Sequence, residues 1–106
     1  MIKLLNILKE ITVNKPGDPN WQKVYDYIEN GSKGNLDLSN TDIKRLPSSL
    51  KKVGGDLDLY NTPITSLPDG LTVGGYLDLR NTPLSQTHTK EQIRQMAPGI
   101  KGNIYM

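Results

Sequence analysis

The sequence predicts an α/β solenoid, in which short repeated units stack so that their strands form one parallel sheet and helices close the ends. Three observations lead to this prediction. A segment of 20 or 21 residues recurs along the chain, every copy contains leucines alternating with an aspartate, and apolar residues have helical spacing on both sides of the repeats. Because one domain usually spans about 100–200 residues, we expect residues 1–106 to form a single domain.

The repeat occurs three times within residues 34–84. Its copies begin at Gly34, Gly55 and Gly75, and each continues as Leu-Asp-Leu followed by an Asn-Thr pair. Since successive side chains of a strand point to opposite sides, the leucines should face inward and the aspartate outward. The asparagine that follows each trio is expected to point inward too and to form a buried amide ladder; the three are Asn40, Asn61 and Asn81.

The second half of each copy is predicted to return as an extended chain. Its prolines favour an extended backbone with few ladder hydrogen bonds; they are Pro47, Pro63, Pro68 and Pro83. Its apolar residues should fill the far side of the core; they are Ile43, Ile64, Leu84, Leu46, Leu67, Leu50 and Leu71. The glycine pairs Gly54-Gly55 and Gly74-Gly75 suit a tight bend into the next strand.

The pattern Leu-Asp-Leu-x-Asn-Thr-x-Ile-x-x-Leu-Pro-x-x-Leu resembles the short bacterial type of leucine-rich repeat over about residues 34–86. The resemblance implies a right-handed coil with a parallel sheet on its concave face and an extended convex side. It also implies the general function of that family, which is to present the sheet to a protein partner. Small repeats with paired glycines are similar to ones found in phage and bacterial proteins, and this likeness implies a phage-encoded protein.

Both ends of the repeats are predicted to carry helices, which close a solenoid. Residues 1–31 form the expected N-terminal cap, with one helix over 2–11 and a second that begins at Asp18-Pro19 and ends at Asn30-Gly31. Residues 85–106 are expected to form a helix over about 90–97 and a fourth strand. The inward residues of the last two helices should be Trp21, Val24, Tyr25 and Ile28, then Ile93 and Met96. Thr89 with Gln92 indicates a capping box.

The composition argues against several classes of function. There is no cysteine, and the only histidine, His88, lies in a predicted linker without a carboxylate spaced to orient it. We therefore expect no enzyme activity, no cofactor and no metal site. The net charge of +2 is weak for a nucleic-acid binder, which argues against nucleic-acid contact by Lys44, Arg45, Lys51 and Lys52. Without a long apolar run or a signal peptide we expect no membrane partner and a cytoplasmic location, the host cytoplasm for a viral protein.

The candidate binding site is the exposed face of the predicted sheet. Its partner-binding residues are predicted to be Asp37, Asp56, Asp58, Tyr60, Tyr76, Asp78, Arg80 and Tyr105. The aspartates favour contact with a basic patch on the partner, and the tyrosines and Arg80 are the expected anchors, because tyrosine and arginine are enriched at binding hot spots. Stacked aspartates about 4.8 Å apart repel each other, so the alternatives are that each carboxylate bonds within the scaffold or that a divalent cation bridges them.

These observations predict a non-enzymatic interaction module that binds a protein partner through its sheet face. A phage inhibitor or modulator of a host protein is the narrower form of this prediction. The alternative is a structural protein that self-assembles through its N-terminal helix or its C-terminal edge strand, because an unpaired edge invites pairing. The chain is expected to be a monomer or a weak homo-oligomer.

Overall fold

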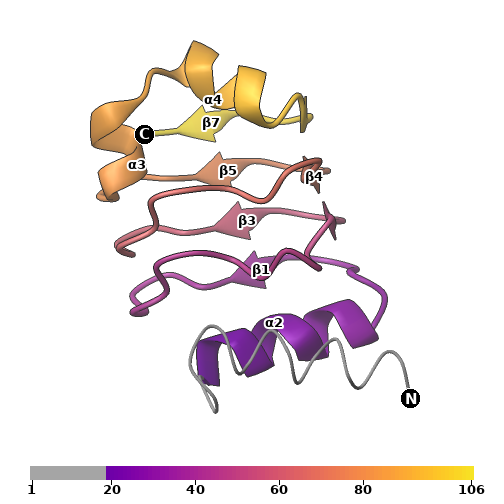
Figure 1. The fold of residues 1–106 in the computed structure, drawn as a ribbon. Coiled ribbons are helices and arrows are strands. Elements are labelled where there is room, and N and C mark those ends of the chain that lie inside the picture. The colour runs from indigo at the N-terminus through magenta and orange to yellow at the C-terminus, as the bar shows by residue number, and fades with distance from the viewer. Residues whose placement is uncertain (1–18) are drawn as a thin grey trace.

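The computed structural model describes residues 19–106 and shows a compact α/β fold with parallel strands in two sheets (Figure 1). Its elements, in order, are α2 Pro19–Glu29, β1 Leu36–Asp37, β2 Lys52–Val53, β3 Leu57–Asp58, β4 Thr72–Val73, β5 Leu77–Asp78, α3 Pro83–Thr87, α4 Lys90–Met96, β6 Gly99–Ile100 and β7 Ile104–Tyr105. The predicted helix over 2–11 and the N-cap at Asp18 lie outside the described residues. Among the described helices, none has the length and apolar character that crossing a membrane requires.

The larger sheet has four parallel strands in the order β1-β3-β5-β7. Its register aligns Leu36, Leu57, Leu77 and Ile104 in one row and Asp37, Asp58, Asp78 and Tyr105 in the next. This confirms the predicted strand positions, including the fourth strand near the end of the sequence. We call the strand, its turn and its return path together one layer, so that successive layers stack along the sheet (Figure 1).

A second, three-stranded sheet runs along the return paths in the order β2-β4-β6. It pairs Val53 with Val73 and Val73 with Ile100, all of which are buried. The strands of this sheet have two residues each, so the return paths share few ladder hydrogen bonds, as expected, but the sequence did not predict a second sheet. The prolines lie elsewhere in the return, so the valine that precedes each glycine pair is free to join a ladder.

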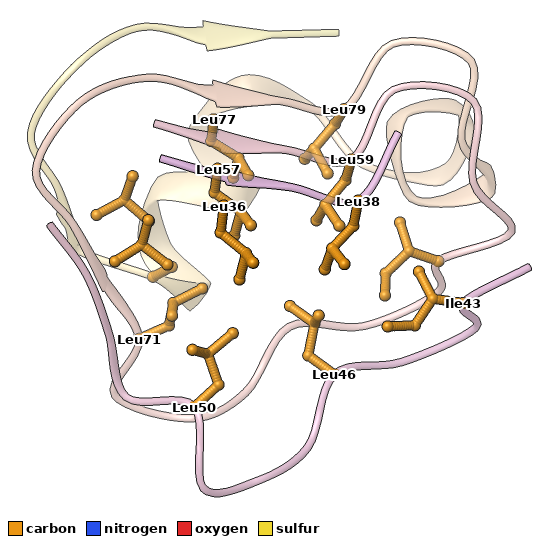
Figure 2. Close-up of a cluster of buried hydrophobic side chains, with 14 of the residues drawn as sticks. Leu36, Leu38, Ile43, Leu46, Leu50, Leu57, Leu59, Leu71, Leu77 and Leu79 are labelled. Carbon is orange, nitrogen blue, oxygen red and sulfur yellow. The ribbon is translucent and has the colours of Figure 1, made fainter. Parts of the chain in front are cut away.

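The core lies between the two sheets and consists of stacked aliphatic residues (Figure 2). Looking along the stack, the first leucines of the three trios form one column and the second leucines form another. Leu46 and Leu50 from the return path approach these columns from the opposite side. The predicted inward residues of the returns are buried, except that Leu67 is half-buried. Each added layer therefore extends one continuous apolar stripe.

Helix α2 covers the first layer with the face that its spacing predicts. Trp21, Val24 and Tyr25 are buried, Ile28 is half-buried, and the Trp21 and Tyr25 rings meet edge to face with 6.1 Å between centroids. The helix ends as expected, because Gly31 takes a positive φ of 93° and its N–H donates to the Ile28 carbonyl.

The C-terminal helix forms where it was predicted, and one assignment of its inner face was wrong. Helix α4 has the capping box between Thr89 and Gln92, and Ile93 is fully buried. Met96, which was expected to face inward, is instead 39% exposed, and Ala97 is buried in its place. Ala97 is the C-cap residue of α4, and its N–H donates to the Ile93 carbonyl at 2.9 Å, which holds this short side chain on the same side as Ile93.

Helix α3 was not anticipated. Pro83 was interpreted as part of an extended return, but it occupies the first turn of this helix, and the Thr82 hydroxyl accepts the Ser85 N–H at 3.1 Å. A threonine followed by a proline is a helix-start signal, so the sequence contained the information. The helix replaces the extended return of the third layer.

Candidate functional site: the outer face of the four-stranded sheet

The eight predicted binding residues come from all four strands of the larger sheet and their flanks. We call the side of this sheet that points away from the core the outer face. The register places Asp37, Asp58, Asp78 and Tyr105 in a middle column of this face. Asp56 and Tyr76 precede β3 and β5, and Tyr60 and Arg80 follow two residues after the aspartates, so they belong to the flanking columns.

Each aspartate of the middle column accepts a backbone hydrogen bond from the residue two positions later. Asp37 accepts the Ser39 N–H, Asp58 the Tyr60 N–H and Asp78 the Arg80 N–H, each at 3.0 Å. These N–H groups lie just beyond the strand, so the carboxylate accepts them in place of a backbone carbonyl of a neighbouring strand. The recurrence of aspartate in the repeat therefore has a structural cause, as one of the sequence-based alternatives proposed.

Asp56 has a different structural role, between layers. Its Oδ1 accepts the Tyr76 N–H of the next layer at 2.9 Å, just as Asn35 Oδ1 accepts the Asp56 N–H at 2.8 Å. A Cβ placed on Gly75 would lie 1.9 Å from the same Asp56 oxygen, so a side chain at this position would displace the carboxylate from the Tyr76 N–H. Asp56 thus joins two layers, and part of its hydrogen-bonding capacity is already used inside the fold.

Arg80 forms the most developed polar contact of the outer face. Its Nε and Nη2 donate to the Asp78 carboxylate, the shortest contact being 2.7 Å, and its guanidinium carbon lies 5.3 Å from the Tyr60 ring centroid. Burial alone would raise the pKa of Asp78, but the hydrogen bonds from Arg80 and its charge hold that pKa below the ordinary value. The Asp78 side chain is 5% exposed and the Arg80 side chain 58% exposed, so the pair reaches from the scaffold into solvent.

Two tyrosines meet at the edge of the outer face nearest β7. The Tyr76 and Tyr105 rings are 5.3 Å apart between centroids and nearly perpendicular. Desolvation raises the pKa of the Tyr76 hydroxyl, and the negative charges of Asp56, Asp58 and Asp78 raise it further. Tyr76 therefore stays neutral at physiological pH and can donate a hydrogen bond within an acidic neighbourhood.

One contact to the first strand was missed by the sequence analysis. The Lys23 ammonium, on α2, donates to the backbone carbonyl of Asp37. The Asp37 pKa is lowered by hydrogen bonds from the Ser39 hydroxyl and N–H and by the nearby Lys23 charge. Lys23 lies on the exposed side of α2, where a lysine predicts only solvation, so its sequence position held no signal for this contact.

The other chemical groups considered from the sequence do not join this face. His88 follows α3, and its Nδ1 lies 2.8 Å from the Thr87 hydroxyl. Within residues 19–106 no group of three or more histidine, aspartate or glutamate side chains is arranged to hold a metal ion.

Comparisons with known proteins add no assignment. No protein-family model matches this sequence, and no curated protein or solved structure is significantly similar to it. The resemblance to leucine-rich repeats therefore depends on the repeated residues themselves.

Proposed function

We propose that the protein is a non-enzymatic interaction module that binds a protein partner through the outer face. One observation carries this proposal. Three large hydrophobic side chains are clearly exposed in the described part of the chain, and two of them, Tyr60 at 39% and Tyr105 at 41%, lie on this face. Exposed tyrosines beside an exposed arginine have the composition of binding hot spots.

We also propose that the layers form a leucine-rich-repeat solenoid. Two parallel ladders with constant register, a continuous aliphatic core and one turn chemistry in every layer support this interpretation. A stack of this kind presents side chains at fixed spacing on a sheet that backbone hydrogen bonds hold in place. Such a surface needs little ordering when it binds, which favours affinity.

The narrower form of this proposal is a phage protein that inhibits or modulates a host protein in the host cytoplasm. It rests on the likeness of the paired-glycine repeats to repeats of phage and bacterial proteins. A bacterial lysate is accordingly the first source in which to look for the partner.

A pull-down with mass spectrometry tests the function. The wild type is compared with a variant that carries Asp58→Ala, Tyr60→Ala and Arg80→Ala, and with a control variant that carries Asp42→Ala, Lys44→Ala and Gln95→Ala at exposed positions elsewhere. Circular dichroism verifies that both variants fold. We expect a protein retained by the wild type and the control but lost from the outer-face variant. Equal retention by all three would show that the outer face is not the binding surface.

A second candidate function is self-assembly through the β7 edge. It is favoured by the observation that β7 is hydrogen-bonded to β5 and to no other described strand. Sedimentation velocity at increasing protein concentration tests it. A rising sedimentation coefficient would favour assembly, whereas a constant monomer value would remove this candidate.

A further inference from the structure

The middle column of the outer face shows a regular pattern with one interruption. In the first layer, the side chain two positions after the aspartate donates to it, because the Ser39 hydroxyl bonds Asp37 Oδ1 at 2.6 Å. In the third layer Arg80 does the same for Asp78. In the second layer the corresponding residue is Tyr60, and only its backbone N–H bonds Asp58.

Asp58 is consequently the aspartate of this column that has no side-chain donor in the described part of the chain. Within residues 19–106 it makes no salt bridge, and the Arg80 guanidinium, although close enough to interact with its charge, is bonded to Asp78 instead. Asp58 is half-buried, so its carboxylate is partly desolvated yet still reachable. A charged group in that position gains from a cationic donor supplied from outside.

The surroundings of Asp58 favour arginine over lysine as that donor. Tyr60 follows it and Tyr76 lies in the next layer, so aromatic rings are present on the same face. A guanidinium can bond a carboxylate with two N–H groups and stack on an aromatic ring at once, which an ammonium cannot do. Arg80 already shows this arrangement inside the molecule, with Asp78 and the Tyr60 ring as its two contacts.

We propose that the outer face recognises an arginine side chain of its protein partner, which docks on the Asp58 carboxylate beside Tyr60 and Tyr76. This inference rests on the proposed function and names the chemistry of the partner. Charge complementarity supports it. The outer face holds four aspartates and one arginine, whereas the whole chain has a net charge of +2. A cationic segment is therefore attracted to this face and repelled by the rest of the molecule.

Fluorescence anisotropy with labelled peptides tests the proposal. The probes are nona-arginine and nona-citrulline, since citrulline has nearly the same shape as arginine but no charge. The Asp58→Asn variant keeps an acceptor for the Tyr60 N–H and is therefore expected to fold. Asp69→Asn, in an exposed turn of the return path, makes the same change of charge at a distant site.

We expect nona-arginine to bind the wild type and Asp69→Asn equally, and Asp58→Asn about tenfold more weakly. Nona-citrulline should bind none of them. In a second variant, Tyr60→Arg, the second layer carries an arginine at the position that Arg80 has in the third layer. This arginine can bond Asp58 and should therefore also weaken nona-arginine binding, while Tyr60→Phe should not. Equal binding by Asp58→Asn and Asp69→Asn, or equal binding of both peptides, would overturn the proposal.

The pull-down separates this inference from the proposed function. If the triple variant loses a partner that Asp58→Asn retains at full strength, the outer face binds its partner without the arginine contact. If the triple variant also retains that partner, the outer face itself is not the binding surface.

Discussion

At the scale of single residues, each layer leaves its strand through an asparagine and a threonine. Asn40, Asn61 and Asn81 have φ values of 58°, 56° and 58°, in the left-handed region that asparagine tolerates better than most residues. Their amides do form a ladder, with Asn61 donating to Asn40 at 2.8 Å and Asn81 to Asn61 at 2.7 Å. The ladder is exposed rather than buried, which corrects the expectation from the sequence.

The left-handed residue explains the correction. Alternation of side chains holds only while the backbone stays extended. The turn at asparagine changes the phase, so that the following threonine faces inward instead. Thr62 and Thr82 are buried, and their hydroxyls donate to the carbonyls of Leu59 and Leu79 three residues earlier. The Asn-Thr pair in every repeat indicates this turn. The asparagine was predicted to face inward because the strand was assumed to continue through it.

Substitution of Asn61 tests this account. Asn61→Ala keeps the strained φ and removes both amide bonds, so we expect the free energy of unfolding to fall by about 2 kcal/mol. Asn61→Gly also removes the amide but relieves the strain, and it should be about 1 kcal/mol more stable than Asn61→Ala. Urea unfolding measures both. If alanine were tolerated better than glycine, strain at this position would not control stability.

The glycine pairs make a second prediction at this scale. A Cβ on Gly74 would lie 2.2 Å from the Gly54 carbonyl oxygen, which is backbone and cannot turn aside. Gly74→Ala should therefore force two layers apart and lower the free energy of unfolding by about 3 kcal/mol. Gly70→Ala is the control, because nothing lies within 4 Å of its Cβ and only its φ of 73° is unfavourable. We expect the control to lose about 1 kcal/mol in the same urea experiment.

At the scale of elements, the helices at the two ends donate hydrogen bonds to the outermost backbone carbonyls. On α2, Trp21 Nε1 donates to the Arg45 carbonyl at 3.1 Å. On α4, Arg94 donates to the carbonyls of Ile100 at 3.1 Å and Gly102 at 2.8 Å. In a longer stack, the backbone N–H groups of a further layer would donate to these end carbonyls. Here the side chains of the helices donate to them instead.

Removal of Arg94 tests this function of α4. Arg94→Ala leaves two carbonyls without these donors, and since Arg94 is exposed we expect a loss of about 1–2 kcal/mol in unfolding free energy. Amide hydrogen exchange should rise in β6 and β7 and remain unchanged in β1. Gln95→Ala, the neighbouring exposed residue, serves as control. Uniform exchange across the sheet in Arg94→Ala would indicate that the guanidinium does not secure this end.

An element could be predicted from the sequence where its own residues carry a recognisable pattern. The repeat predicts four strands, because only one register aligns the apolar residues of successive copies; these strands begin at Leu36, Leu57, Leu77 and Ile104. Helix α4 is predicted by its capping box. The second sheet could not be read in the same way, because a two-residue strand such as Lys52–Val53 has no periodicity of its own. On the outer face, the spacing placed the residues in the correct columns. It could not decide whether the aspartates bond within the scaffold, because the N–H groups that they accept become available only where the strands end.

At the scale of the whole molecule, charge is distributed so that the fold is sensitive to acid. Asp78 has a lowered pKa because Arg80 bonds its charged form, and Asp37 has a lowered pKa because of Ser39 and Lys23. A carboxyl group with a lowered pKa in the folded state contributes stability that is complete above its unfolded pKa of about 3.9. That contribution is lost as the pH falls through the lowered folded value.

Urea unfolding at a series of pH values measures this contribution for Asp78. At about pH 6 we expect Asp78→Asn to be less stable than the wild type by about 1 kcal/mol, a value kept low because the Arg80 side chain is 58% exposed. The difference should shrink below about pH 4 and be smallest near pH 2, where the wild-type carboxyl group is protonated as well. Asp69→Asn, outside this pair, should follow the wild type at every pH. A difference that stays constant down to pH 2 would mean that the amide fails to replace the carboxyl group for reasons of shape, and that the charge of Asp78 does not stabilise the fold.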